Sequence, residues 1–132
     1  MRIARPSHDL AAAERFYTDG LGMDVLFRTP APDDESSDDP PADGVHRLVM
    51  VGWPGAAWHI ELVGDPATDP RPTEEDLLVC YLDGPVDPEL IERLVDAGGE
   101  RVPSANPYWD DRGVTVADPD GYRLVLTSRS WD

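Results

Sequence analysis

The chain has a single cysteine, no lysine and no apolar run long enough to cross a membrane. Cys80 has no partner within the chain, so an internal disulfide is excluded, and such cysteine usage is typical of a reducing compartment. Met1 is followed at once by Arg2-Ile3-Ala4-Arg5, without the apolar stretch of a signal peptide. We therefore expect a cytoplasmic protein with no membrane span.

Positive charge is also scarce. Eleven arginines face 27 acidic residues, which gives a formal net charge of -16. Such a field repels nucleic acids and anionic lipids, because binding to either depends on neutralising phosphates with Lys or Arg. The composition predicts no nucleic-acid or membrane partner and would favour a cationic small molecule. The alternative is that the acidity only keeps the protein soluble.

The length of 132 residues predicts a single domain, 1–132, that can bury a core without metals or disulfides. One segment does not fit a core. From Pro30 to Asp43 the chain has six acidic residues, four prolines and no large apolar side chain. Because this composition cannot offset the entropy of ordering, we expect an acidic surface loop over 30–45. A charged lid over a pocket is the alternative function of this loop.

The remainder of the chain contains an internal repeat. Glu14-Arg15 and Glu92-Arg93 lie at corresponding places in two helix-like segments, each of which leads into a strand. Asp9 and Asp87 are suited to cap these helices. The apolar stripe of the first helix includes Phe16 and Tyr17, which we expect in the core.

Strand signals follow each helix. Segments 46–51 and 58–63 flank a Gly-Pro-rich turn, and segments 113–117 and 122–127 flank Asp118-Pro119-Asp120-Gly121. Both pairs predict β-hairpins. The fold class is therefore α+β, with two βαβββ modules, about 1–64 and about 76–128. Two such modules predict a curved, trough-like mixed sheet with the helices on its outer face.

Three segments in this order resemble the vicinal oxygen chelate superfamily of glyoxalases, bleomycin-resistance proteins and extradiol dioxygenases. They are the Asp9-to-Gly22 helix, the His59-Ile60-Glu61-Leu62 strand and the Asp118-to-Gly121 hairpin. The resemblance covers nearly the whole chain apart from the acidic loop. It implies a paired βαβββ fold, a homodimer and a cavity inside the sheets.

The resemblance also implies where metal ligands would lie. The corresponding positions here are Arg2, Glu61, Leu77 (or Leu78) and Val125. Among these, only Glu61 could bind a cation, because a guanidinium has no available lone pair and the other side chains are aliphatic. We therefore predict no metal or other cofactor, and an Arg2–Glu61 ion pair in place of half of the metal site. The alternative is that Arg2 turns to solvent at the chain terminus.

Strand alternation offers a second possible metal site. It places His59, Glu61, Leu48 and Met50 on one face, with His46 added if the register holds. His46, His59 and Glu61 would form a two-histidine, one-carboxylate set that suits a divalent metal such as iron or zinc. Alternatively, local hydrogen bonds satisfy the histidines.

In the second hairpin, the same alternation places Arg112, Val114 and Val116 on the face of Val125. Ahead of it, Tyr108 and Trp109 could stack a planar or cationic ligand. They could equally close the end of the barrel or pack in a dimer contact.

These patterns favour a small-molecule binding protein similar to the bleomycin-resistance members, with drug or metabolite sequestration as its role. The alternative is a glyoxalase- or dioxygenase-like enzyme that uses a divalent metal or metal-free acid/base chemistry by His59 and Glu61. The predicted ligand-binding residues are the apolar and aromatic Leu48, Met50, Tyr108, Trp109, Val114 and Val125 and the polar Arg2, His59, Glu61 and Arg112.

Overall fold

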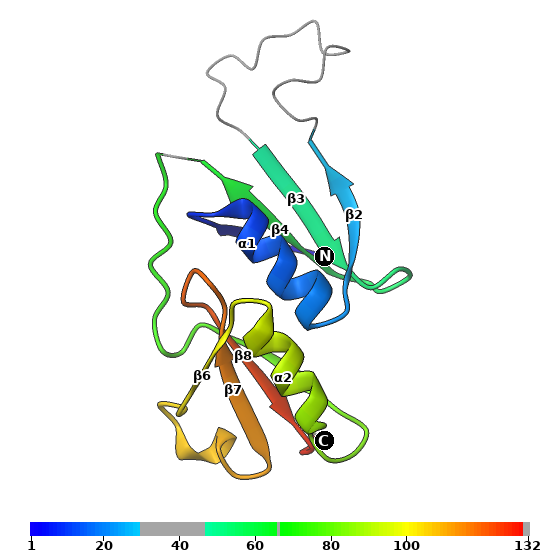
Figure 1. Ribbon diagram of the computed structural model, residues 1–132, viewed down its shortest axis with the longest axis vertical. Coiled ribbons are helices and arrows are strands. Elements are labelled where there is room, and N and C mark those ends of the chain that lie inside the picture. The colour runs from blue at the N-terminus through cyan, green and yellow to red at the C-terminus, as the bar shows by residue number, and fades with distance from the viewer. Residues whose placement is uncertain (30–46, 66, 131–132) are drawn as a thin grey trace, which may run out of the picture.

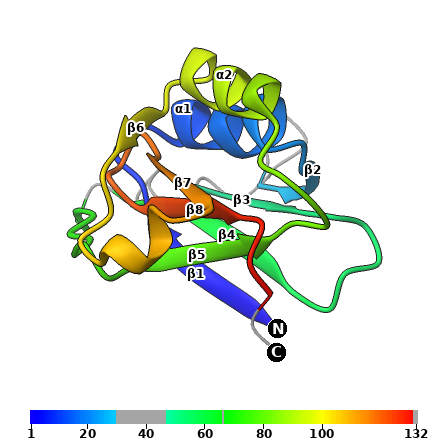
Figure 2. The same cartoon turned by 90° about the horizontal axis from the view of Figure 1, so that it is seen from below.

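The computed structural model describes residues 1–29, 47–65 and 67–130 and contains two four-stranded sheets with helices on one side of both (Figures 1 and 2). The acidic segment 30–45 and His46 lie outside the described residues. The elements in chain order are β1 (Arg2–Pro6), α1 (Leu10–Arg15), η1 (Phe16–Gly20), β2 (Asp24–Arg28), β3 (Arg47–Gly52), β4 (His59–Gly64), β5 (Leu77–Tyr81), α2 (Pro88–Asp96), β6 (Glu100–Val102), η2 (Pro107–Trp109), β7 (Gly113–Ala117) and β8 (Arg123–Thr127).

The two modules have the same topology. The strand order is β1-β4-β3-β2 in the first sheet and β5-β8-β7-β6 in the second. In each, the first strand pairs with the last in parallel and the other pairs are antiparallel. The predicted α+β class and paired βαβββ modules are confirmed, as two mixed sheets.

Both predicted helix caps are confirmed. The Asp9 carboxylate accepts a hydrogen bond from the Ala12 amide at 3.1 Å, and the Asp87 carboxylate accepts one from the Glu89 amide at 2.9 Å. These bonds satisfy amides that have no partner inside the helix.

Among the helices of the described residues, none has the length and the apolar character needed to cross a lipid bilayer.

The first helix does not end at Arg15 but continues as the π-helical turn η1, which packs against α2. A β-carbon on Gly20 of η1 would lie 3.0 Å from the Leu94 side chain and 3.3 Å from that of Ala97. A glycine therefore permits the two helices to approach closely. Phe16 and Tyr17, expected in the core, are both fully buried there.

The helix-facing side of each sheet carries the core. In the first sheet Val49, Val51, Ile60 and Leu62 are buried in one cluster with the side chains of α1. Because strand side chains alternate, the residues between them face away from the helices. We call the sheet surfaces turned away from α1 and α2 the inner faces.

A buried polar contact joins the modules. The Tyr17 hydroxyl donates a hydrogen bond of 2.6 Å to the Asp118 carboxylate, and the Arg5 guanidinium lies 3.4 Å from the same hydroxyl. The other Asp118 oxygen accepts from the amides of Asp120 and Tyr122. Burial raises the pKa of Tyr17 well above its ordinary value, and burial also raises the pKa of Asp118. The hairpin turn of the second module is thus tied to the helix of the first.

Tyr17→Phe should lower the free energy of unfolding by about 1 to 3 kcal/mol, because it leaves the buried Asp118 carboxylate without its tyrosine donor. Chemical denaturation at neutral pH measures the loss. Tyr122→Phe is the matched control, since the Tyr122 hydroxyl has no hydrogen bond within the described residues. Equal stability of the Tyr17→Phe and Tyr122→Phe variants would contradict the prediction.

The stability of the wild-type protein should also fall as pH rises above about 10, where the unfolded tyrosine ionises while folded Tyr17 keeps its proton.

Candidate functional site

Polar and apolar side chains meet on the inner face of the first sheet. The register pairs Arg2 with His59 and Met50 with Glu61, so these four side chains share that face. Leu48 lies opposite Val63 on the same face. The predicted alternation of this hairpin is confirmed.

Arg2 is held by two acceptors. Its Nη1 donates to Glu61 Oε1 at 3.2 Å, and its Nε donates to His59 Nε2 at 3.1 Å. His59 Nε2 therefore acts as an acceptor, which places the proton of a neutral imidazole on Nδ1. The predicted Arg2–Glu61 ion pair is confirmed, and the alternative of an Arg2 turned freely to solvent is wrong.

A β-bulge adds two apolar side chains that the sequence patterns did not identify. Val25 pairs with Val51 and Phe27 with Met50, so that Leu26 and Phe27 together oppose Met50. Leu26 lies beside His59, since a β-carbon on Gly52 would be 3.1 Å from Leu26 Cδ1 and 3.0 Å from His59 Cβ. The signal that could have found them is the consecutive Val25-Leu26-Phe27, which breaks the two-residue alternation of a strand.

The residues at the superfamily's metal-ligand positions do not fit a metal ion. Arg2 is a cation that already uses Glu61 as its acceptor. In the second sheet Val79 pairs with Val125, and Leu77 lies two residues before Val79 on the same inner face, whereas Leu78 packs against the core. Leu77 is thus the residue that shares a face with Val125. None of these positions except Glu61 offers an oxygen or nitrogen donor lone pair.

The described residues contain no group of three or more His, Cys, Asp or Glu side chains that could hold a metal ion. The alternative site of His46, His59 and Glu61 includes a residue outside the described part of the chain. Within the described part, both His59 and Glu61 bind the guanidinium of Arg2.

The predicted register of the second hairpin is wrong. Val125 lies opposite Thr115, and Val114 lies opposite Leu126 on the helix-facing side. The turn contains the five residues 118–122. The Asp118 amide donates to the Tyr122 carbonyl and the Tyr122 amide donates to the Asp118 carboxylate, so Tyr122 does not enter the strand. An additional residue in the turn reverses the facing of one strand relative to the other. Val114 and Val116 therefore do not share the face of Val125.

The segment 103–112, which includes η2, covers β7 and β8 on the inner face of the second sheet. Ser104 Oγ lies 2.6 Å from Thr115 Oγ1, and the Thr127 hydroxyl donates to the Arg112 carbonyl at 3.2 Å. Figure 2 shows this gold segment on the side of β7 and β8 opposite α2. Val125, which lies on this face, has an exposed fraction of 0%. The predicted cavity wall at Val125 has no accessible surface in this arrangement.

Tyr108 and Trp109 belong to a partly exposed aromatic cluster. The Trp109 ring contacts those of Tyr108 and Tyr81 with centroids 4.9 and 6.5 Å apart. The Arg129 guanidinium stacks 4.0 Å from the Tyr108 ring centre. Tyr81 and Arg129 were not identified from the sequence, because they join the cluster only through the fold.

Arg112, the last predicted ligand-binding residue, precedes β7 and does not belong to it. Its backbone has a φ of 66°, a left-handed conformation that is uncommon outside glycine. Its carbonyl accepts from the Thr127 hydroxyl and the Ser128 amide. Strand alternation therefore does not apply to Arg112, and its backbone anchors the covering segment.

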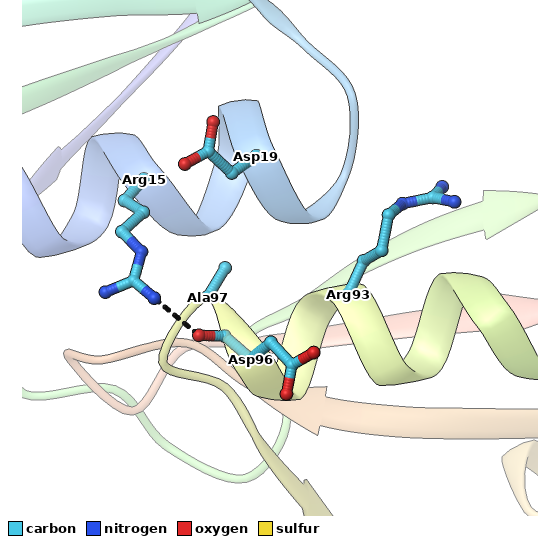
Figure 3. Close-up of a pocket in the computed structure, with 5 residues that line it drawn as sticks. All are labelled: Arg15, Asp19, Arg93, Asp96 and Ala97. Carbon is cyan, nitrogen blue, oxygen red and sulfur yellow. Dashed lines mark hydrogen bonds between the residues drawn. The ribbon is translucent and has the colours of Figure 1, made fainter.

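A shallow hollow lies between η1 and α2, on the helix side of the molecule (Figure 3). The Arg15 guanidinium donates to the Asp96 carbonyl at 2.6 Å and so satisfies the last carbonyl of α2. The hollow is lined by Arg15, Asp19, Arg93, Asp96 and Ala97. Its contacts hold the two helices together.

Two family models match the chain, the YycE-like N-terminal domain over residues 1–32 and the YycE-like C-terminal domain over residues 75–128. The uncharacterized protein YycE of Bacillus subtilis (strain 168) is 38% identical over 129 residues, which cover 96% of this chain and 85% of YycE. A crystal structure of a YycE protein from B. subtilis, of unknown function and with a suggested glyoxalase or fosfomycin-resistance role, has a TM-score of 0.79. That match has 33% identity and covers 100% of this chain and 90% of that structure.

Two further solved structures share the fold. TnmS3, an antibiotic binding protein from Streptomyces sp. CB03234, is 26% identical with a TM-score of 0.61, covering 98% of this chain and 93% of TnmS3. The trypanothione-dependent glyoxalase I of Leishmania major is 22% identical with a TM-score of 0.66, covering 96% of this chain and 83% of that enzyme. The latter likeness concerns the fold alone.

Proposed function

Because the chain belongs to the YycE-like family within the vicinal oxygen chelate superfamily, we propose that it binds a small molecule without a metal, on the inner face of its first module. The observation that carries this proposal is the Arg2–Glu61 ion pair at two positions where the superfamily's metal enzymes have ligands. The fixed cation and its carboxylate lie beside an apolar surface formed by Met50, Leu26 and Phe27.

The apolar part of this surface is accessible to solvent. The side chains of Leu26 and Phe27 are exposed, with fractions of 42% and 52%. Adjacent exposed apolar side chains are typical of ligand or protein contacts. The antibiotic-binding relative TnmS3 adds support, since it has a similar fold and 26% identity.

The alternative, a glyoxalase- or dioxygenase-like enzyme, has less support. Metal-free acid/base catalysis would require His59 or Glu61 to reach a substrate proton. Both side chains instead accept hydrogen bonds from Arg2.

A homodimer remains a prediction. Its candidate contacts are the exposed side chains of Leu26, Phe27, Tyr81 and Tyr108. Sedimentation equilibrium of the purified chain measures the oligomeric state.

A melting-temperature screen of small aromatic and aliphatic acids, amines, neutral compounds and antibiotics tests the binding function. A ligand at 100 times its dissociation constant adds about 2.7 kcal/mol of stability. For a domain of this length the melting temperature should rise by on the order of 10 °C. The variant Phe27→Ala tests the location of the site: it should keep the fold and weaken the response to the ligand. A broad panel without any stabilising compound would contradict the proposal.

Metal independence needs a separate measurement. Elemental analysis of protein purified without chelators, followed by titration with Fe, Mn, Ni and Zn, should show no stoichiometric ion, because the four inherited positions provide one carboxylate. One tightly bound ion per chain would overturn the metal-free proposal.

A further inference from the structure

We propose that Arg2 is a fixed cation that binds a carboxylate of the ligand, and that the ligand's apolar body extends from Arg2 across the inner face toward Phe27. This inference rests on the proposed small-molecule binding function. It differs from the expectation of a cationic ligand that the net charge of -16 suggests.

Arg2 has donors to spare. Of the five N–H groups of a guanidinium, one on Nε and one on Nη1 are directed to His59 and Glu61. The other N–H groups, on Nη1 and Nη2, have no hydrogen-bond partner within residues 1–29, 47–65 and 67–130. A planar guanidinium with free donors matches the geometry of a carboxylate and can bind it with two parallel hydrogen bonds.

The accessible member of the ion pair is the cation. The Arg2 side chain is 50% exposed, whereas that of Glu61 is 16% exposed. Glu61 and His59 hold the guanidinium from the protein side, so less conformational entropy is lost when a ligand binds. A cationic ligand would have to compete with Arg2 for Glu61, whereas an anionic ligand can use the donors that remain.

The apolar surface sets the form of the ligand. The sheet order is β1-β4-β3-β2, so Arg2 and Phe27 are separated by three strand spacings, or roughly 14 Å across the sheet, and by a further two residues along the strands. Met50 lies between them, opposite both Glu61 and Phe27. A carboxylate attached to an aromatic or aliphatic body of this reach would contact both ends. Long-range repulsion by the acidic protein is screened beyond about 8 Å at physiological ionic strength, so the local contact with Arg2 decides the affinity.

Three compounds of equal shape and different charge test the inference. They are biphenyl-4-carboxylate, the neutral biphenyl-4-carboxamide and the cationic biphenyl-4-carboxamidine, each titrated into the full chain by calorimetry. The carboxylate should bind about tenfold or more tightly than the amide, because charge-assisted hydrogen bonds replace neutral ones. Equal affinities, or tighter binding of the amidine, would overturn the inference while leaving a small-molecule site in place.

Variants separate the two charges of the ion pair. Arg2→Gln should remove the preference for the carboxylate, and Arg2→Lys should restore part of it, because a lysine retains the charge but loses the planar fork. Glu61→Gln should strengthen carboxylate binding by removing the nearby negative charge, whereas a site for cations would be weakened. Arg101→Gln, on the exposed β6 strand, is the matched control and should bind as the wild type does.

Folding of each variant is checked by its melting temperature. A carboxylate preference that survives in a folded Arg2→Gln variant would overturn the role of Arg2. If none of the three compounds binds the wild type, the inference also fails. The broad screen then decides independently whether the proposed binding function fails with it.

Discussion

Replacing Val125 with glutamate should lower the free energy of unfolding by about 3 to 5 kcal/mol and should not create a metal site. Val125 is fully buried and lies in register between Val79 and Thr115, under the covering segment 103–112. A carboxylate at this position would have no cation beside it. A glutamate at position 125, although a metal-ligand type of the superfamily, would thus lie in a buried environment that cannot hold a metal ion.

Denaturant unfolding of Val125→Glu measures this loss, and Val125→Gln is the control that has the same shape without the charge. The difference between the two variants should grow as pH rises above about 4.3, because the unfolded glutamate ionises there while the buried one resists it. Elemental analysis should find no stoichiometric metal. A Val125→Glu protein that is as stable as the wild type and holds one divalent ion per chain would show that the inner face is open to metals.

Phe16→Ala should destabilise the protein by about 3 to 5 kcal/mol, the cost of deleting a large buried aromatic side chain. Phe16 has an exposed fraction of 0% and stacks edge-on against Tyr17 with ring centres 4.9 Å apart. It also approaches the second module, since a β-carbon on Gly99 would lie 2.7 Å from Phe16 Cε2. The loss should therefore weaken the contact between the modules as well as the core of the first.

Phe27→Ala is the matched control, because these are the two phenylalanines of the chain and Phe27 is 52% exposed. Its effect on stability should stay below about 1 kcal/mol. Chemical denaturation followed by both far-UV circular dichroism and tryptophan fluorescence compares the variants. A small effect of Phe16→Ala, or a large effect of Phe27→Ala, would contradict the assignment of Phe16 to the core and of Phe27 to the open inner face.

Several local features could be predicted because they depend on residues only a few positions apart. The caps at Asp9 and Asp87 follow from a carboxylate placed before a helix-forming run. The face shared by Met50 and Glu61 follows from strand alternation once the hairpin pairing is correct. The Arg2–Glu61 contact could be predicted from the resemblance to the superfamily, in which the first and last strands of a module are neighbours.

Other features could not be read from local patterns. The second hairpin has the same strand signals, yet Tyr122 belongs to its turn because the Asp118 carboxylate binds the Tyr122 amide. One residue was enough to reverse the facing of Val114. The β-bulge at Leu26 likewise changed which apolar side chains reach the inner face.

The repeat, the two module folds and the chemistry available at the superfamily's metal-ligand positions follow from the amino-acid sequence alone. The identity of a side chain fixes its donors and charge in any conformation, so Arg2, Leu77 and Val125 could not supply metal ligands wherever they lie. Which surfaces are open depends on the three-dimensional packing: residues 103–112 cover β7 and β8 on the inner face of the second module, whereas the inner face of the first exposes Arg2 and Phe27. Accessibility depends on which distant segment packs on a face, and no spacing within one strand records that.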